Sequence, residues 1–217
     1  FAKTLANYAD LFVTDAFGTA HRAHCSTEGV GHYLPTVAGL LVKKEISALG
    51  GAVLRPERPF VSIIGGAKIS DKIGVIRNMM SKADAVIIGG GMANTFLAAQ
   101  GYLMRASLVE FTKIEEAKEI LQEARENNVK LLLPQDFIVA KGLDFPDTAR
   151  ECNIDSLEEG DMALDIGSKT RAEYIKTIEN AKTIVWNGPM GVFEIDAFAG
   201  GTNAVSYTHL TLPTNRE

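Results

Sequence analysis

Residues 65–72, with the sequence GGAKISDK, directly follow the apolar run 60–64 and open an amphipathic helical pattern. Two glycines let the backbone turn tightly, and a helix that follows points unpaired N–H groups and the positive end of its dipole at a ligand. Lys68 and Lys72 are four residues apart, which predicts that both ammonium groups lie on one side of that helix. The segment is therefore a candidate polyphosphate site. A tight strand-to-helix turn with two solvated lysines is the alternative.

Strand-like and helical patterns alternate along the chain. The expected strands are apolar on consecutive positions, as in strands buried on both faces, and the expected helices carry apolar residues at three- and four-residue spacing. The strands are expected at residues 10–14, 59–64, 85–88, 129–133 and 183–186, and the helices at 35–53, 68–81, 91–100, 111–127, 168–180 and 193–205. This alternation predicts an α/β fold, with a Rossmann-like parallel sheet between helices on both faces in three α/β/α layers. Ligands bind such sheets at the carboxyl ends of the strands, where Gly65, Gly89 and Asn187 fall.

The composition narrows the classes of function. The chain has 22 Lys and Arg against 27 Asp and Glu, a net charge of −5, and its basic residues are dispersed. This argues against a nucleic-acid partner and favours small anions. No apolar run has transmembrane length, so no membrane partner is expected. Cys25 and Cys152 fit neither a disulfide framework nor a metal finger, which predicts a reducing, cytoplasmic setting.

Residues 15–25, DAFGTAHRAHC, follow the first expected strand and place Arg22 beside His21. An arginine fork binds phosphate or carboxylate through two parallel hydrogen bonds, and a neighbouring histidine can add a third. The loop is a candidate second anion site, with a surface loop and an unpaired arginine as the alternative. His21, His24 and Cys25 lack a recognised metal-binding spacing, so no metal site is expected.

Two further segments follow expected strands. The triple glycine at residues 89–91 leaves room for a flat adenine ring, or permits close helix–sheet packing. Residues 186–194, WNGPMGVFE, carry a Gly-Pro turn and Glu194, a candidate acceptor for both ribose hydroxyls or a capping acid of the next helix. Trp186 is expected in the core. Neither glycine cluster has the G-x-G-x-x-G order of a dinucleotide fingerprint.

Two segments are assigned no ligand. Residues 163–170, ALDIGSKT, end like a P-loop, but Ser168 separates Gly167 from Lys169 and the upstream glycine spacing is wrong. We therefore expect no P-loop, and expect Ser168 to be the N-cap of the following helix. Residues 206–217, SYTHLTLPTNRE, show neither helical periodicity nor a cap, so the junction after residue 205 is expected to be foreign.

The segments DAFGTAHRAH, GGAKISDKI, IIGGGMANTF and WNGPMGVFE together resemble the phosphoglycerate kinase family, and the resemblance runs from residue 1 to about residue 205. It implies two Rossmann-like domains joined by a helix and a hinge. Residues 1–34 would end the N-terminal, phosphoglycerate-binding domain, and residues 35–54 would be the interdomain helix. Residues 55–205 would form an incomplete C-terminal nucleotide-binding domain, and residues 206–217 an artefactual tail outside the family.

The resemblance also implies an activity: reversible phosphoryl transfer from 1,3-bisphosphoglycerate to ADP, giving 3-phosphoglycerate and ATP. Mg²⁺ would be carried with the nucleotide, in a cytoplasmic monomeric enzyme of glycolysis. Arg22 and His21 match residues that hold phosphoglycerate. The implied nucleotide contacts are Gly66, Ala67, Lys68, Lys72, Gly90, Ala163, Asn187, Pro189 and Glu194, of which Lys68 and Lys72 are the candidate catalytic residues.

Departures from the family pattern limit what the resemblance implies. The family's amino-terminal region, with a catalytic arginine, is absent, and so is a later glycine-rich segment whose Asp assists Mg²⁺. We therefore expect no turnover from this chain alone. Ala163 stands where many relatives have Gly and could crowd the base, and Ser168 replaces a common Pro. A nucleotide-binding α/β module without transfer chemistry is the first alternative, and a dinucleotide oxidoreductase, which lacks its fingerprint here, is the second.

Overall fold

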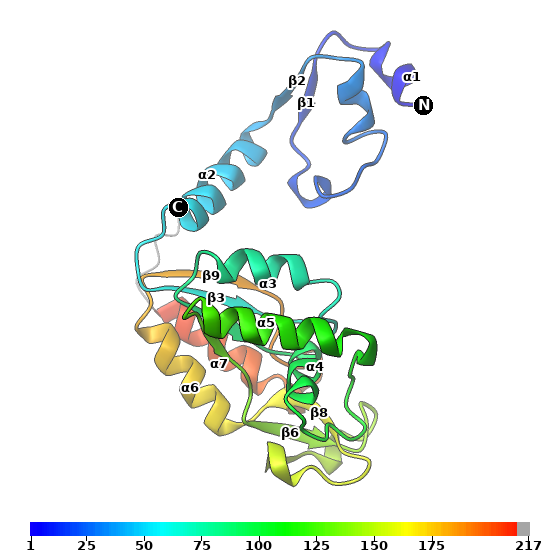
Figure 1. Ribbon diagram of the computed structural model, residues 1–217. Coiled ribbons are helices and arrows are strands. Elements are labelled where there is room, and N and C mark those ends of the chain that lie inside the picture. The colour runs from blue at the N-terminus through cyan, green and yellow to red at the C-terminus, as the bar shows by residue number, and fades with distance from the viewer. Residues whose placement is uncertain (212–217) are drawn as a thin grey trace. The chain divides into compact units, whose positions relative to one another are not determined.

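The apolar run Phe60–Ile64 forms strand β3, which is buried along its whole length. In the computed structural model, which describes residues 1–211 and only the backbone of residues 209–211, β3 is an inner strand of a four-stranded parallel sheet (Figure 1). The sheet order is β5-β4-β3-β9. Its other strands are β4 (Ala85–Ile88), β5 (Lys130–Leu132) and β9 (Thr183–Asn187). The predicted parallel sheet is therefore confirmed.

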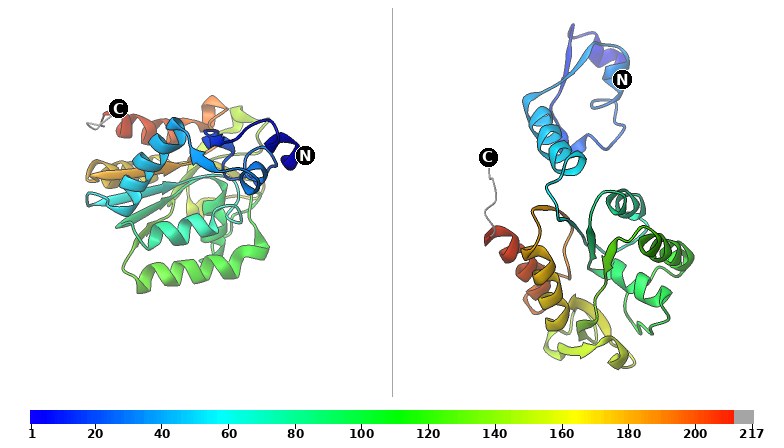
Figure 2. Two further views of the ribbon diagram at one scale, coloured as in Figure 1. Left: turned by 90° about the horizontal axis from the view of Figure 1, so that it is seen from above. Right: turned by 60° about the vertical axis from the view of Figure 1, so that its left-hand side comes forward.

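Helices cover both faces of this sheet, as the alternating pattern predicts (Figure 2). On one face lie α3 (Ile73–Met80), α4 (Gly91–Ala99) and α5 (Ile114–Glu126). On the other lie α6 (Ser168–Glu179) and α7 (Gly200–Thr211). None of the helices described is long and apolar enough to cross a membrane.

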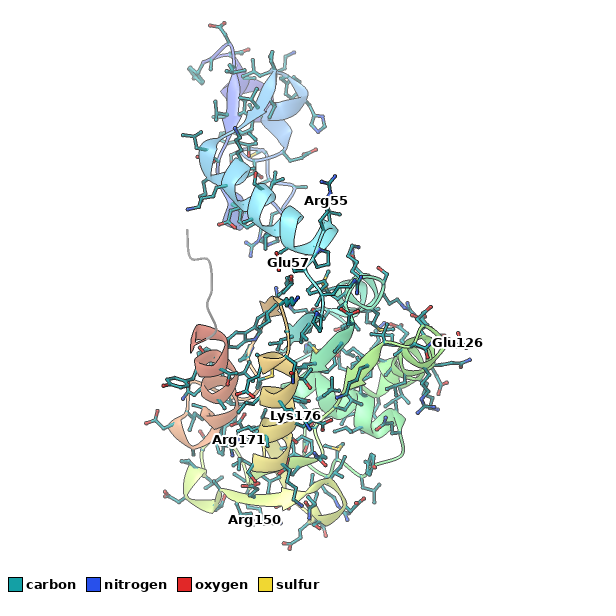
Figure 3. All side chains as sticks on the ribbon, turned by 90° about the vertical axis from the view of Figure 1, so that its left-hand side faces the viewer. Arg55, Glu57, Glu126, Arg150, Arg171 and Lys176 are labelled. Carbon is teal, nitrogen blue, oxygen red and sulfur yellow. The ribbon has the colours of Figure 1, made fainter. Side chains whose placement is uncertain are left out.

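A second sheet, which the sequence pattern did not predict, follows β5. Its strands β6 (Asp136–Ala140), β7 (Arg150–Asn153) and β8 (Met162–Ile166) are antiparallel, in the order β7-β6-β8. Only the short 3₁₀ helices Pro146–Thr148 and Ile154–Ser156, and no α-helix, stand between these strands, so a search for alternating strands and α-helices does not find them. At the end of the sheet, the buried carboxylate of Asp161 pairs with Lys141 and with Arg150, whose side chain Figure 3 labels.

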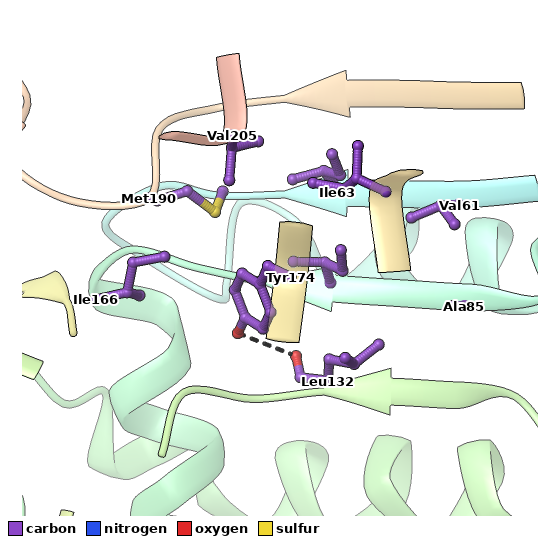
Figure 4. Close-up of a cluster of buried hydrophobic side chains, with 10 residues drawn as sticks. Val61, Ile63, Ala85, Leu132, Ile166, Tyr174, Met190 and Val205 are labelled. Atoms are coloured by element: carbon purple, nitrogen blue, oxygen red, sulfur yellow. Dashed lines mark hydrogen bonds between the residues drawn. The ribbon is translucent and has the colours of Figure 1, made fainter. Parts of the chain in front are cut away.

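Tyr174, the largest fully buried side chain among the residues that the structure describes, joins α6 to the parallel sheet. Its ring lies in a cluster with Val61 and Ile63 from β3, Leu132 from β5 and Val205 from α7 (Figure 4). Its hydroxyl donates a hydrogen bond of 2.7 Å to the carbonyl oxygen of Ile88. Packing and one satisfied polar group thereby fix helix α6 against the strand that leads into the candidate site.

Helix α7 corrects one prediction from the sequence. The helical pattern was expected to begin at residue 193 and to end at residue 205, but the helix starts at Gly200 and continues to Thr211. Val205 and Thr208 are buried three residues apart, and the hydroxyl of Thr208 donates to the carbonyl oxygen of Ala204. The bond gives the buried hydroxyl a hydrogen-bond partner within the helix. Residues 212–217 lie outside the described part of the chain.

The chain divides into two compact units, Phe1–Arg55 and Pro56–Glu217, and both sheets described above belong to the second. The first unit contains α1 (Ala2–Ala6), β1 (Phe12–Thr14), β2 (Thr36–Ala38) and α2 (Leu40–Leu54). Strands β1 and β2 pair in parallel. The expected helix from residue 35 was therefore wrong at its start, because residues 36–38 are a strand.

Two side chains show how the first unit is built. The carboxylate of Asp15, just after β1, accepts a hydrogen bond of 2.9 Å from the backbone N–H of Val42 and so caps the first turn of α2. Val13 is 52% exposed, so the expectation of burial on both faces was wrong for β1. A two-stranded sheet offers little surface against which its own residues can be buried.

Replacing the hydroxyl of Tyr174 tests how strongly α6 is fixed. We expect Tyr174→Phe to lower the free energy of unfolding of the second unit by about 1–2 kcal/mol, because a buried hydrogen bond is lost. The measurement is urea unfolding followed by the fluorescence of Trp186, the only tryptophan, which packs against the same cluster. Tyr102→Phe, at an exposed tyrosine, is the matched control and should change little. Equal losses in the two variants would contradict the assignment.

Candidate functional site

The carboxyl ends of β3, β4 and β9 meet at one edge of the parallel sheet, and the loops that follow them are in backbone contact. The N–H of Gly65 donates to the carbonyl oxygen of Asn187 at 2.8 Å. A Cβ atom on Gly65 would lie 1.9 Å from the carbonyl oxygen of Pro189. Gly90 has a φ of +70°, and a Cβ there would lie 2.5 Å from the carbonyl oxygen of Gly66. Only glycine fits these positions.

A pocket of about 340 Å³ lies beside these loops. Six of the residues predicted to contact nucleotide line it: Gly66, Ala67, Gly90, Ala163, Pro189 and Glu194. The wall also includes Phe137, Leu164 and Met190, and the polar groups of Asn94 and Asp165. An apolar pocket with few polar groups suits a flat, largely apolar ring system. The structure thus brings together residues that lie up to 128 positions apart, from Gly66 to Glu194.

The two lysines and Asn187 do not line the pocket but lie at the same edge of the sheet. Helix α3 begins at Ile73, so Lys68 and Lys72 both precede it, and the prediction that they share a helix face was wrong. The turn over residues 67–72 delays the helix. Lys72 is half-buried and donates from its ammonium to the side-chain oxygen of Asn187, whereas Lys68 is exposed.

The remaining sequence interpretations have mixed outcomes. Of the two interpretations of the triple glycine, close packing holds at Gly89, since a Cβ atom there would lie 2.4 Å from the sulfur of Met190. Glu194 stands well before α7, so it does not cap that helix, and it lines the pocket. Trp186 is half-buried against the core cluster, as expected, and its indole N–H donates to the carbonyl oxygen of Gly188.

The expected N-cap role of Ser168 was wrong. The N-cap of α6 is Gly167, and the hydroxyl of Ser168 donates to Glu151 at 2.5 Å. The first turn of α6 is capped instead by Asp136 at the start of β6, whose carboxylate accepts from the N–H groups of Lys169 and Thr170 at 2.9 and 2.8 Å. Hydrogen bonds of this kind lower the pKa of Asp136 against the opposing effect of its burial.

Asp165 is the site residue that sequence reasoning missed. It lies on β8, is 3% exposed and lines the pocket. One carboxylate oxygen accepts a 2.6 Å hydrogen bond from the N–H of Gly201 at the start of α7, and the other is buried without a hydrogen-bond partner in the described chain. The signal was a lone carboxylate inside the apolar run MALDI.

Burial raises the pKa of Asp165 to about 6, against the effects of the backbone N–H groups of Gly201 and Ile166 and the charge of Arg171, which lower it. Arg171 stands on α6 (Figure 3). A carboxyl group that titrates near neutral pH therefore forms part of the pocket wall.

In the first unit, Arg22 and His21 lie in an exposed loop, where the Nε of Arg22 donates to the Nε2 of His21 at 3.2 Å. The two residues predicted to share a ligand are thus in contact. Within the described residues, no three His, Cys, Asp or Glu side chains are grouped as a metal site.

The family model described as phosphoglycerate kinase matches residues 1–213. The chain belongs to the phosphoglycerate kinase family. The match reaches into residues 206–217, the segment that was expected to be foreign to the family.

Individual phosphoglycerate kinases agree with this assignment. The chain is 57% identical over 206 residues to the phosphoglycerate kinase of Moorella thermoacetica, covering 95% of this chain and 52% of that protein. It is 58% identical over 207 residues to that of Clostridium perfringens, covering 94% and 52%. The structure of the Coxiella burnetii phosphoglycerate kinase superposes with a TM-score of 0.86 at 46% identity, covering 96% of this chain and 54% of that one. The chain thus spans about half the length of the curated phosphoglycerate kinases it matches.

The titration of Asp165 predicts a pH-dependent stability. Because the folded pKa of about 6 lies above the ordinary value of 3.8, the folded state binds this proton more tightly and gains stability as the pH falls. We expect the difference in unfolding free energy between the unchanged chain and Asp165→Asn to shift by about 2 kcal/mol in favour of the unchanged chain from about pH 7.5 to about pH 4.5. Urea unfolding followed by circular dichroism at both pH values measures it. A difference that does not vary with pH would show that Asp165 does not titrate in this range.

Proposed function

We propose that this chain carries the nucleotide-binding part of a phosphoglycerate kinase, an enzyme that transfers a phosphoryl group reversibly between 1,3-bisphosphoglycerate and ADP, giving 3-phosphoglycerate and ATP. The observation that carries the proposal is the pocket lined by Gly66, Gly90, Ala163 and Glu194, beside the strand end where Lys72 contacts Asn187. Family membership makes this reaction the first to test.

The pocket and the lysines are proposed to bind different parts of the nucleotide. The apolar wall is proposed to take the base, and Glu194 at its rim to accept hydrogen bonds from the ribose hydroxyls. The phosphates would then extend toward Lys72, with Lys68 and the turn after β3 near by. An ammonium that exchanges its amide partner, Asn187, for phosphate oxygens gives up a neutral acceptor for a charged one.

The chemistry proposed here needs no general base. In the direction that consumes ATP, the attacking group is the carboxylate of 3-phosphoglycerate, which is ionised at neutral pH. The transition state spreads negative charge over the equatorial oxygens of the transferred group, and Lys72 with Lys68 is proposed to stabilise it. Arg22 and His21, in contact in the first unit, are proposed to hold phosphoglycerate.

Mg²⁺ is proposed to arrive with the nucleotide. Mg²⁺ keeps several waters and binds through substrate phosphates and one or two carboxylates, so it does not require a protein cage. The residues proposed to face the phosphates, Lys68 and Lys72, are cations, so the phosphate oxygens and water would supply the ligands of the ion. Bound there, the ion would neutralise charge on the phosphates.

The setting proposed for the enzyme is the cytoplasm, with nucleotide and phosphoglycerate as its only partners and a monomeric state. The two widely separated cysteines support a reducing setting, and the acidic net charge of −5 argues against a nucleic-acid partner.

The chain alone is expected to bind nucleotide without turnover, because it spans about half of its relatives. The test is a coupled assay of ATP consumption in the presence of 3-phosphoglycerate, beside calorimetric titration with MgADP. Ordinary turnover by the chain alone would contradict the expectation. If the protein extended to the full length of its relatives binds MgADP but transfers no phosphate, a binding module without transfer chemistry is the better description.

Lys72 is expected to act mainly in the transition state. In the full-length enzyme, Lys72→Ala should lower kcat by about 100-fold while weakening MgADP binding by less than about tenfold, since the charge it stabilises develops during transfer. Steady-state kinetics and titration measure the two effects. Lys82→Ala, at a half-buried lysine in the turn after α3 whose ammonium donates to the side chain of Asn78, is the matched control. Equal losses in turnover and binding would show uniform binding instead.

A further inference from the structure

One short segment, residues 107–110, touches both parts of the candidate site. On the pocket side, the hydroxyl of Ser107 accepts a hydrogen bond of 2.9 Å from the N–H of Ala163. The carbonyl oxygen of Leu108 accepts one of 3.2 Å from the side chain of Asn94. Ala163, Leu108 and Asn94 all line the pocket. We call residues 107–110 the bridging segment.

The other end of the bridging segment reaches the turn that carries the lysines. The carboxylate of Glu110 accepts two hydrogen bonds from Ser70, one from its hydroxyl at 2.7 Å and one from its backbone N–H at 3.1 Å. Ser70 stands between Lys68 and Lys72 in the sequence. The backbone of Glu110 is itself held, because its N–H donates to the hydroxyl of Thr95 in α4 at 3.1 Å. The backbone of Glu110 is thus fixed to α4, while its carboxylate holds Ser70 in the turn that carries the lysines.

The charge of Glu110 persists at neutral pH. Burial raises the pKa of this carboxyl, but the hydrogen bonds from Ser70 and Ile69 and the nearby charge of Lys68 outweigh burial and leave the pKa below its ordinary value. A carboxylate that accepts two hydrogen bonds from one residue fixes the orientation of that residue as well as its position.

We propose that Glu110 is a positioning residue for phosphate binding: through Ser70 it holds the turn that carries Lys68 and Lys72 in register with the base pocket. The inference rests on the proposed function, because it takes the two lysines as the phosphate side of the nucleotide site. Glu110 itself touches no substrate in this assignment. It acts by keeping two ammonium groups at a fixed distance from the pocket, so that one ligand reaches both.

Electrostatics and positioning predict opposite effects of removing this carboxylate. By Coulomb attraction alone, the loss of a negative charge beside Lys68 would strengthen binding of an anionic ligand. By positioning, the loss frees the turn and weakens binding of phosphates, while the base pocket keeps its own contacts. A ligand without phosphates should therefore not detect the change.

The experiment compares ADP with adenosine on the 217-residue chain by isothermal titration calorimetry. We expect Glu110→Ala to weaken ADP binding by about tenfold and to leave adenosine binding within about twofold. Glu110→Gln keeps one acceptor for Ser70 and should restore most of the affinity for ADP. Ser70→Ala, which changes no charge, should weaken ADP binding in the same direction. Glu115→Ala, at an exposed glutamate of α5 paired with Lys118, is the control for net charge and should change neither affinity.

The other outcomes contradict either the inference about Glu110 or the proposed nucleotide site. Tighter ADP binding in both Glu110 variants would show that Glu110 acts through charge and would overturn the proposal. Equal weakening of ADP and adenosine would show a general structural role, which also overturns it. If the unchanged chain binds neither ligand, the proposed nucleotide site fails and the inference fails with it. If the unchanged chain binds ADP and adenosine, and Glu110→Ala binds each of them with the same affinity as the unchanged chain, the inference alone fails.

Discussion

The site depends on the parallel pairing of β3 with strands on both of its edges. Strand β3 is buried at every residue and runs parallel to β4 and β9, which flank it. The carboxyl ends of the three strands therefore lie at one edge of the sheet. Three loops that are far apart in the sequence must then turn within the width of three strands. One wall of the pocket, the backbone contact between the loops and the position of Lys72 result from this crowding, and strands β6 and β8 supply the opposite wall of the pocket.

The two parts of the site have different physical characters. The pocket is largely apolar, with a protonatable carboxyl in its wall, so it is suited to burying a flat ring. The edge beside it is polar and carries Lys72 and Lys68, so it is suited to attracting negative charge. A site divided in this way can bind the base of a nucleotide tightly in every step of a reaction while its interactions with the phosphates change between ground state and transition state.

The parallel sheet could be predicted because its strands are consecutive apolar runs with helical patterns between them. Apolar, β-branched residues such as Ile63 and Ile87 strongly favour buried strands at these positions. The antiparallel sheet could not, because β7 has the polar sequence RECN and each of β6 and β7 begins with a charged residue whose partner lies elsewhere in the fold. The motifs correctly predicted that Gly66, Gly90 and Glu194 lie together, because all three line the pocket. The start of α3 could not, since Glu110 holds Ser70 from 40 residues away, and no local pattern records such a contact. The pairing of Asp165 with α7 is hidden for the same reason.

The contact at Gly65 also has a genetic consequence. All missense changes of a glycine codon introduce a residue with a Cβ atom, and at this position that atom would lie 1.9 Å from the carbonyl oxygen of Pro189. The neighbour is backbone, so no side chain can move aside to make room. A single nucleotide change in the first two positions of that codon therefore cannot be conservative. Only synonymous changes, at the third base, are tolerated in this codon, whereas the exposed positions of α5 can accept many different amino acids.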